Sequence, residues 1–597
     1  MLEEKLILVT IGPVQSFIGQ ARKTVDFYAG SKMITKMIEW SYEILEGELG
    51  NIEILHPYLK YEGNEKFKCF PNYFLAKAKF DEEKFNDLDE KLREKVYEKL
   101  VEYYRKSFHD KYNETILREH IEDCFNIYLI YNDYCDKCYK QNYEDIYKKL
   151  NAVKNTRRFK QMNESGRKCS LCGIRNGIFY REKDSIEYLL SKEAIPLNEN
   201  NKLNENESLC YICFMKRFSG GFENEMRSPS TVKVATLGWV KRKNKNQLDD
   251  YNNLIRVLIK DEDIDEKRYY EDWILNKLRE KGKCEEKNKI IKKYMQELYK
   301  GENDKKDMPT KYYAVIKMDI DDLGKWLSGE YFKDDDLLNQ QISLSKILYE
   351  FSQKIEHLLE DKGKVVYAGG DDFLFFVTLD NMFEVIKEIE NNFEEVQSID
   401  CIKNSNKKIT FSTSVVVAHY KTPLSQVLKI LNETLNIAKE RYKTIVSELE
   451  CPKNAMAFSY ITYSNTLRTT YFKKKNNLEY MRHLIFNLKE NLSRKFIYDL
   501  EDEISKICDN ISYSEMLEVK KIIEVEIRRL IYRSYKDESN VKEEIEKQSN
   551  EIRSLLDEYF IEISPNEYVL DIQNYFNFLH ICENLSKEIY ALGSDFE

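Results

Sequence analysis

The amino-acid sequence predicts an α+β fold centred on a strand, a helix and an acid-tipped hairpin. A strand-like apolar run over 312–318 ends in Asp319-Ile320-Asp321-Asp322, and a helical pattern begins at Leu323. Further along the chain, two runs of β-branched and aromatic residues flank Gly369-Gly370-Asp371-Asp372, which is typical of a tight hairpin. This succession of elements is the one that a ferredoxin-like palm requires.

The two acidic segments together predict a site for divalent cations. Residues two apart on a strand face the same side, so we expect Asp319 and Asp321 to point together. The adjacent carboxylates of Asp371 and Asp372 repel each other unless a cation neutralises them, and the preceding glycines allow close approach of a ligand. Such a palm could hold two magnesium ions against a nucleoside triphosphate. The alternative is an acidic hairpin on a solvated surface.

The composition is that of a large protein with several buried cores. The 597 residues suggest about three or four domains, and 42% hydrophobic with 33% charged residues excludes a disordered chain. A formal net charge of −10 argues against a strong general nucleic-acid binder, although a local basic groove stays possible. No apolar run reaches membrane-spanning length and no signal-peptide pattern is present, so we expect a cytoplasmic protein without membrane contact.

The elements on either side of this palm can be placed in order along the chain. Residues 1–160 predict a first domain, with a strand at 5–11, a helix that contains positions 17, 21, 25 and 28, a strand at 71–76 and a helical insertion from about 81 to 160. Residues 308–463 form the domain with the acids, and they continue with a strand at 409–418 and a helix at 424–448. Residues 464–597 are almost wholly helical by pattern and contain no catalytic-looking cluster.

Cysteine spacing predicts a zinc-binding domain over residues 161–307. Thirteen cysteines without an export signal favour reduced thiols and metal sites over disulfides. Two Cys-x-x-Cys knuckles can each present two thiolates to one ion, and together they complete a closed, structural tetrahedral site. Its four ligands would be Cys169, Cys172, Cys210 and Cys213. The alternative is a set of unrelated buried cysteines. Cys135 and Cys138 form a third pair without an obvious partner pair, and we interpret it as not binding a metal.

Several other chemistries are not supported by the sequence. His109-Asp110 is the dipeptide of metal-dependent phosphohydrolases, but only seven histidines are present, and we interpret His109 as a solvated helix residue. No Gly-Lys-Ser/Thr phosphate loop and no Gly-x-Ser-x-Gly elbow occurs.

At the level of motifs, the chain resembles the large polymerase/cyclase-like subunit of type III CRISPR effector complexes, of the Cmr (III-B) kind. The residues that support this resemblance are 11–18 with Ala21-Arg22, the paired cysteine knuckles, and Gly-Gly-Asp-Asp preceded by Met318-Asp319-Ile320-Asp321. Pro71-Asn72 and Ser228-Pro229-Ser230-Thr231 are also similar to that family. The motifs span most of the chain in the expected order.

The resemblance implies two ferredoxin-like palm domains that share a composite nucleotide site, a helical zinc-binding domain between them and a C-terminal helical domain. By similarity, Mg²⁺ or Mn²⁺ would be held by Asp319, Ile320, Asp371 and Asp372, of which the three acids are also catalytic. Nucleotide contacts would come from Gly369, Gly370, Ser412 and Lys439. In the first palm, Gln15 and Ser16 match the family motif with Gly12 and Arg22. They serve a second nucleotide or fix the strand–helix turn.

The family's reaction implies that ATP is converted to a signalling nucleotide when target RNA binds. The product is either cyclic oligoadenylate or a conjugate of AMP with S-adenosylmethionine. The expected partners are crRNA, target RNA and other Cmr-type subunits, including small helical ones. Many relatives begin with an HD nuclease domain, whereas this sequence opens on the first-palm strand, so we expect no single-stranded DNase activity. Ser414 stands where relatives often have glycine, which leaves the acceptor undecided.

Two other function classes stay open on the residues alone. One is a stand-alone diguanylate-cyclase-like (GGDEF-like) enzyme that acts on GTP, against which the zinc knuckles and large helical regions argue. The other is a noncatalytic scaffold for crRNA and partner subunits, against which the three intact acids argue. Labelled ATP with target RNA distinguishes these functions from the proposed reaction.

Overall fold

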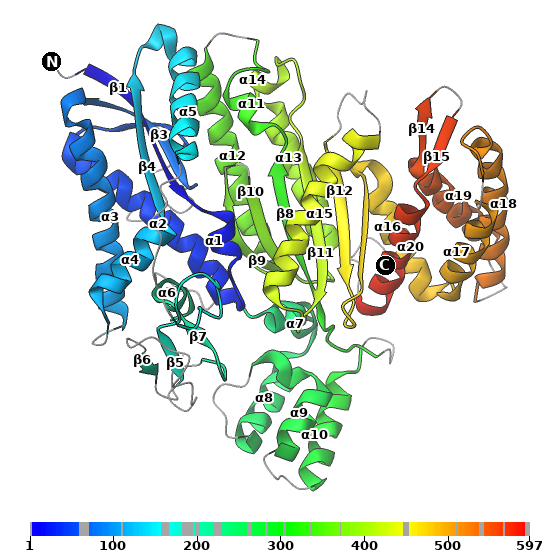
Figure 1. Cartoon of the computed structure of the whole chain (residues 1–597). Helices are drawn as coiled ribbons and strands as arrows, with labels where there is room; N and C mark the ends of the chain where they lie inside the picture. The colour runs from blue at the N-terminus through cyan, green and yellow to red at the C-terminus, as the bar shows by residue number, and fades with distance from the viewer. Residues whose placement is uncertain are drawn as a thin grey trace.

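The computed structural model shows an α+β chain in which two sheet domains lie side by side, flanked by helical regions (Figure 1). The residues that it describes are 3–58, 71–108, 112–156, 166–181, 195–197, 203–218, 229–259, 265–280, 285–301, 306–333, 336–370, 372–445, 453–508, 511–536, 542–564 and 567–590. The predicted site residue Asp371, as well as His109 and Ser228, lies outside them. Among the described residues no helix is long and apolar enough to cross a membrane.

The first sheet has four antiparallel strands in the order β2-β3-β1-β4. Its strands are β1 (Glu3–Gly12), β2 (Glu53–His56), β3 (Tyr73–Phe80) and β4 (Asn126–Asp133). Its helices are α1 (Gln15–Gly19), α2 (Thr24–Leu49), η1 (Glu82–Lys84), α3 (Phe85–Phe108), α4 (Glu114–Cys124), η2 (Asp136–Cys138) and α5 (Tyr139–Asn155). This is the ferredoxin-like order, with the fourth strand beside the first.

Two expectations for this region are wrong. Strand β4 lies inside the stretch predicted to be helical, because pairing along the whole of β1 stabilises an extended backbone there. The helix expected through positions 17–28 is two helices. The carboxylate of Asp26 accepts the backbone N–H groups of Arg22 and Lys23, which starts α2 anew and separates it from α1.

The second sheet has six strands in the order β13-β12-β11-β8-β10-β9. The strands are β8 (Tyr312–Ile320), β9 (Gly363–Gly369), β10 (Asp372–Val377), β11 (Phe411–His419), β12 (Ala455–Ile461) and β13 (Leu467–Lys473). The helices are α11 (Leu323–Leu327), α12 (Leu337–Leu359), α13 (Met382–Ser398), α14 (Asp400–Lys403) and α15 (Leu424–Ile445). The inner order β11-β8-β10-β9 repeats that of the first sheet, and the predicted strands and helix are confirmed. The sheet continues to Lys473, past the expected boundary at 463.

Strand β8 is buried on both faces, which explains its nearly continuous apolar sequence. Phe373 of neighbouring β10 packs edge-on against Phe351 of α12 at 5.4 Å, and Phe351 packs in turn against Phe393 of α13 at 5.3 Å. On the opposite face, Val315 shares a buried cluster with Val427 of α15. Helices on both sides therefore fix the sheet end at which the acids lie.

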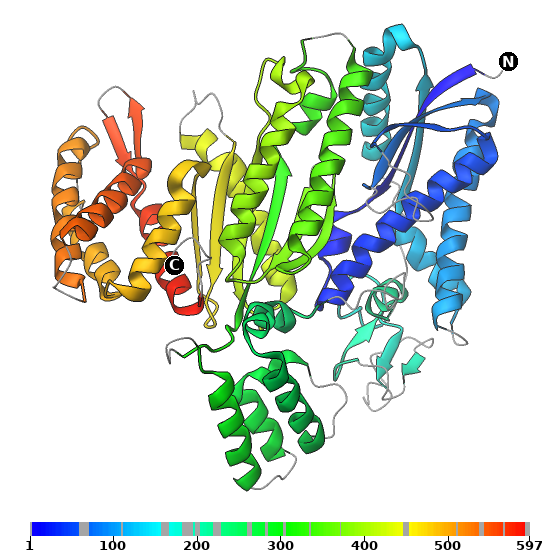
Figure 2. The ribbon, with the colours of Figure 1, turned by 180° about the vertical axis from the view of Figure 1, so that it is seen from behind.

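The two palms pack against each other directly (Figure 2). Phe27 of α2 meets Phe376 of β10 edge-on at 6.4 Å. The buried hydroxyl of Tyr139 on α5 donates to Gln341 Oε1 on α12 at 2.6 Å. These contacts join residues far apart in the sequence into one interface.

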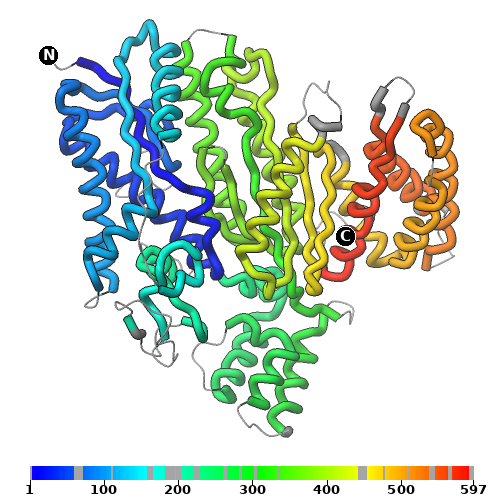
Figure 3. The backbone as a smooth tube through the Cα atoms, in the orientation of Figure 1, coloured from blue at the N-terminus to red at the C-terminus, as the bar shows by residue number. Residues whose placement is uncertain are grey.

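The middle of the chain holds the cysteine knuckles and a group of helices that projects away from the palms (Figure 3). Its elements are β5 (Phe179–Arg181), β6 (Ile195–Leu197), β7 (Ser208–Leu209), α6 (Tyr211–Phe218), α7 (Thr231–Arg242), α8 (Lys245–Ile259), η3 (Glu266–Tyr269), α9 (Glu271–Glu280) and α10 (Glu285–Leu298). Helix α6 lies against α2 and α4, so the knuckle region is part of the first-palm core.

The C-terminal region packs on the outer strand of the second sheet. Its helices are α16 (Lys474–Glu490), α17 (Lys495–Ile507), α18 (Met516–Ser534), α19 (Lys542–Tyr559) and α20 (Ile572–Glu588). The side-chain amide of Asn574 on α20 accepts the backbone N–H of Tyr471 at 3.0 Å and donates to the carbonyl of Tyr471 at 2.9 Å. It therefore pairs with this edge strand as the backbone of another strand would. The hairpin β14 (Phe560–Ser564) and β15 (Glu567–Leu570) interrupts the helical pattern expected there.

Candidate functional site

Three predicted site residues form one row across the second sheet. In the antiparallel ladders, Asp372 of β10 lies opposite Asp319 of β8, and Asp319 lies opposite Ser412 of β11. Residues directly opposite each other in such ladders project from the same face of the sheet. The fold therefore brings two of the three predicted acids together.

The hairpin tip depends on its glycines. Gly369 ends β9, and Gly370 follows with φ +65°, a left-handed conformation that side chains rarely adopt. A Cβ atom at Gly370 would lie 3.9 Å from the Cβ of Pro71, which belongs to the first palm. The turn is thus both left-handed and close to the other domain.

Two lysines from different elements neutralise the acids. Lys439 of α15, which the resemblance implies as a nucleotide contact, forms an ion pair with Asp319. Lys317 is buried on β8, with its Nζ 3.8 Å from Asp372 Oδ1 and 3.1 Å from Asn432 Oδ1. Lys317 is not among the site residues predicted from the sequence. Its signal was a charged residue inside an apolar strand, two positions before Asp319 and hence on the same face.

Burial raises the pKa of Asp319 to about 6; the ammonium of Lys439 opposes this shift and the nearby Asp372 carboxylate adds to it. The side chains of Asp319 and Asp372 are 18% and 22% exposed, so solvent and small ions reach them. A divalent cation bound between Asp319 and Asp372 would offset both the desolvation of Asp319 and the repulsion between the two carboxylates.

Asp321, expected to point to the same side as Asp319, is buried and its carboxylate is engaged within the sheet end. Its carboxylate accepts hydrogen bonds from Thr410 Oγ1 at 2.7 Å, Ser412 Oγ at 2.8 Å and the backbone N–H of Asn454 at 3.0 Å. Strand β8 ends at Ile320, and these donors hold Asp321 at the junction of β11 with the segment before β12. Asp321 thus stabilises the sheet end, and the Ser412 hydroxyl is engaged in that role.

The first palm reaches the acids through the motif that follows β1. Gln15 Nε2 at the start of α1 donates to Asp372 Oδ2 at 3.3 Å. Ser16 is exposed beside it on α1, Gly12 ends β1, and Arg22 is exposed in the turn after α1. Of the first-palm residues predicted to bind nucleotide, Gln15 is the one with a direct contact to the acidic row.

The donor set fits a hard divalent cation. Asp319 and Asp372 offer carboxylate oxygens, which Mg²⁺ and Mn²⁺ prefer. Ile320 can offer only its backbone carbonyl, because its hydrocarbon side chain, which is buried in the core, has no ligand atom.

The four predicted zinc ligands come together. The Sγ atoms of Cys169, Cys172, Cys210 and Cys213 all lie within 4.8 Å of one another, the one such group of potential metal ligands among the described residues. The backbone N–H groups of Leu171 and Cys213 point at Cys169 Sγ and Cys210 Sγ at 3.4 and 3.5 Å. Thiolate sulfurs with backbone N–H donors form a donor set suited to zinc.

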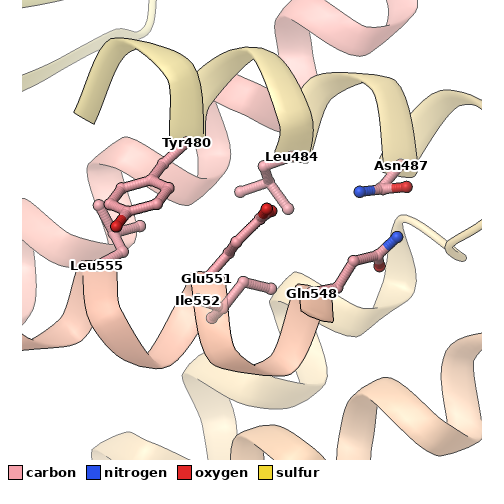
Figure 4. A pocket seen from close by; sticks show the side chains of 7 residues that line it. All are labelled: Tyr480, Leu484, Asn487, Gln548, Glu551, Ile552 and Leu555. Atoms are coloured by element: carbon pink, nitrogen blue, oxygen red, sulfur yellow. The ribbon is translucent and has the colours of Figure 1, made fainter. Parts of the chain in front are cut away.

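A separate pocket lies between α16 and α19 in the C-terminal region (Figure 4). Its lining residues are Tyr480, Leu484, Asn487, Gln548, Glu551, Ile552 and Leu555. Glu551 is paired with His483 at 2.9 Å. The pocket contains none of the residues of the acidic row.

Two family models match the chain where the palms lie. The second palm domain of Cas10/Cmr2 matches residues 312–446, and the N-terminal domain of the CRISPR-associated protein Cmr2 matches residues 6–114. The chain is thus similar to Cas10/Cmr2 proteins over two ranges, residues 6–114 and 312–446. Gln15 lies in the first matched range, and the acidic row lies in the second.

Two curated proteins of type III CRISPR systems are similar to this chain. CRISPR system Cmr subunit Cmr2 of Pyrococcus furiosus is 23% identical over 96% of this chain and 74% of its own length. A single-strand-specific deoxyribonuclease Cas10/Csm1 (subtype III-A) of Methanocaldococcus jannaschii is 26% identical over 33% of this chain and 26% of its own length.

Solved structures share the fold. A chain of the type III-B Cmr-beta complex bound to cognate target RNA superposes with a TM-score of 0.64 at 15% identity, over 98% of this chain and 83% of that chain. The apo state of the same complex gives a TM-score of 0.63 over 98% and 82%.

Proposed function

We propose that the two palms form a nucleotidyltransferase site that uses ATP and two divalent cations and releases pyrophosphate. The observation that carries this proposal is the convergence of Asp319, Asp372 and Gln15 from three elements of two domains. A solvated acidic hairpin has no need for a buried lysine, a partner strand carboxylate and an amide from another domain.

The chain's own residues bind and orient the reacting groups in this proposal. Asp319, Asp371, Asp372 and the Ile320 carbonyl would hold two Mg²⁺ or Mn²⁺ ions, which supply activation of the attacking hydroxyl and neutralisation of the leaving pyrophosphate. Lys317 and Lys439 offset the negative charge of the carboxylates. Gln15 orients Asp372, and the missing side chain of Gly370 leaves room beside the hairpin. Lys439 is also placed to turn towards phosphate oxygens.

The proposed reaction belongs to a type III CRISPR complex. A solved structure of similar fold is a type III-B Cmr-beta complex bound to cognate target RNA, which supports target RNA as a partner. In this proposal target RNA is the activator, and crRNA and other Cmr-type subunits, including small helical ones, are further partners. The attacking group is the 3′-hydroxyl of a second ATP, which leads to cyclic oligoadenylate, or S-adenosylmethionine, which leads to an AMP conjugate. Both acceptors use the same cations.

The test is incubation of the purified complex with labelled ATP, Mg²⁺ or Mn²⁺ and target RNA, with and without S-adenosylmethionine. Mass spectrometry identifies the product and hence the acceptor. We expect product only when target RNA is present. Product from GTP by the isolated chain would instead indicate a stand-alone cyclase, and no product under any condition would indicate a noncatalytic scaffold.

A matched variant separates chemistry from architecture. Asp371→Asn combined with Asp372→Asn removes two negative charges with little change of shape. We expect product formation to be abolished while the complex still assembles. Loss of assembly in this variant would favour a structural role for the hairpin.

A further inference from the structure

A fully buried lysine connects the cysteine knuckles with the first-palm motif. The ammonium of Lys216 on α6 is 0% exposed and donates to the carbonyl oxygens of Phe17 and Gln20, each at 2.7 Å. Phe17 lies in α1 and Gln20 immediately follows it. Carbonyls at the end of a helix have no partner within the helix and carry partial negative charge, so a cation there stabilises its end.

The next residue fixes the neighbouring turn. Arg217 Nε and Nη2 bind the two oxygens of Asp26 at 2.5 and 2.8 Å, and its Nη1 lies 3.2 Å from Glu207. Asp26 is the residue that accepts the N–H groups of Arg22 and Lys23 at the start of α2. Helix α6 therefore binds both the end of α1 and the beginning of α2.

The knuckle determines where these two cations lie. Cys210 directly precedes α6 and Cys213 lies in its first turn, so closure of the four-cysteine site fixes the start of the helix. Lys216 and Arg217 follow Cys213 by about one helical turn. The side chain of Lys216 also packs against Gly30 of α2, where a Cβ atom would lie 3.1 Å from Lys216 Cε.

We infer that Lys216 is a positioning residue for the composite site: it holds α1 so that Gln15 reaches Asp372, and the cysteine knuckle anchors it. The chain of contacts runs from the knuckle through Lys216 to the end of α1 and from the start of α1 through Gln15 to Asp372. Because α1 has only five residues, fixing its end also fixes its start. This inference rests on the function proposed above.

A double-mutant cycle in the assembled complex tests the coupling. Lys216→Met and Gln15→Ala should each lower the rate of product formation by about 10-fold, since each removes hydrogen bonds to or from a charged group. The rate of the double variant should lie within about two-fold of the rate of the less active single variant, because both changes break the same chain of contacts. Multiplicative losses would overturn the inference.

Lys5→Met is the matched control. Lys5 is also a buried first-palm lysine, but its ammonium binds Glu3, Glu82 and Asp133 at the opposite end of β1. Its effect should multiply with that of Gln15→Ala. A non-multiplicative result for Lys5 as well would show general destabilisation and overturn the specific role of Lys216.

Hydrogen exchange of the complex without nucleotide measures how firmly Lys216 holds α1, and this measurement does not depend on activity. In Lys216→Met, amides of residues 15–20 should exchange at least about 10-fold faster than in the parent chain, while bound zinc stays at the parent level. Unchanged exchange of this segment would overturn the inference. If the parent complex makes no product, this measurement still decides the role of Lys216, whereas the proposed function fails.

A milder variant serves if Lys216→Met does not fold. Gly30→Ala favours helix α2 by propensity but crowds Lys216 Cε. It should accelerate exchange of residues 15–20 and show the same non-multiplicative behaviour with Gln15→Ala. Slower or unchanged exchange in Gly30→Ala would overturn the inference.

Discussion

The two palms share one strand order but differ in the row of residues at the same end of the sheet. In the second palm, the row at the start of the third strand consists of Asp372, Asp319 and Ser412. In the first palm, the corresponding row is Tyr73, Thr10 and Tyr128. The same topology thus presents carboxylates in one domain and aromatic rings with a hydroxyl in the other. Fold alone does not determine chemistry; the residues in the row do.

The palms also differ in what holds their site residues. In the second palm, the helix α15 packed on the sheet supplies Lys439, and buried donors fix the sheet end through Asp321. In the first palm, the segment after β1 leaves the sheet and is held by Lys216 of α6, which lies 199 positions after Phe17 in the sequence. One palm carries the charged groups, and the other contributes an orienting amide.

The largest expected effect is on product formation, and it distinguishes the acidic row of the second palm from the corresponding row of the first palm. Asp372→Asn should lower product formation by about 10³-fold, because a lost carboxylate ligand removes several kcal/mol of charge stabilisation. Thr10→Val, in the corresponding first-palm row, should leave the rate within about two-fold. Initial rates with labelled ATP at saturating Mg²⁺ measure both. Comparable losses of activity in the two variants would mean that the rows are functionally equivalent, which would contradict the proposed difference between the palms.

The second largest effect is expected from loss of one cysteine ligand. It tests whether the four-cysteine site stabilises the first palm. Cys210→Ser should release zinc and lower the free energy of unfolding by about 3 kcal/mol or more, since four ligands are needed to close the site. Cys138→Ser changes an exposed cysteine outside the cluster and should keep both zinc content and stability. Metal analysis and thermal unfolding give the two readouts. Full zinc content in Cys210→Ser would contradict the four-cysteine site.

The pH dependence of the free energy of unfolding tests the environment of Asp319 in the second palm. A raised carboxyl pKa means that the folded chain holds this proton to higher pH than the unfolded chain. The contribution of Asp319 to the free energy of unfolding therefore falls as pH rises from about 4 to about 6. In the metal-free chain, Asp319→Asn should be more stable than the parent by about 1–2 kcal/mol at pH 7.5 and much less so at pH 4.5. Denaturant unfolding at the two pH values measures this.

The activity of the parent complex provides the companion readout. Product formation should decrease below about pH 6, where Asp319 becomes protonated and loses its capacity to bind a cation. Because Lys439 opposes the raised pKa, Lys439→Met should move this decrease to higher pH. A less stable Asp319→Asn chain at pH 7.5, or a shift to lower pH in Lys439→Met, would be inconsistent with the burial and charges found around Asp319.

The smallest expected effect concerns the interface between the palms. Tyr139→Phe removes the buried hydrogen bond to Gln341 and should cost about 1 kcal/mol of unfolding free energy. Product formation should stay within about two-fold, because neither residue is in the acidic row. Tyr134→Phe loses only an exposed contact to Asp136 and is the control, with a change below about 0.5 kcal/mol. A large loss of activity in Tyr139→Phe would show that this interface controls the site.

Much of the fold followed from local pattern. The apolar run before Asp319, the glycine-containing hairpin and the Cys-x-x-Cys spacing each encode geometry within a few residues, and all three formed as expected. Strand β4 did not, because its Tyr-rich sequence lies between helical stretches and is decided by pairing with β1. Asp321 has the right spacing for a partner of Asp319, but donors from Ser412 of β11 and from the segment before β12 engage it.

By itself, the sequence determined which residue types are available: the acids, the glycines that permit a left-handed turn, the paired cysteines and two palm-like successions of elements. Only the tertiary structure decided which of them meet. Gln15 and Asp372 are 357 positions apart, and Lys216 and Phe17 are 199 positions apart. Such contacts depend on how packed helices and sheets are placed against each other, and no local periodicity records that placement.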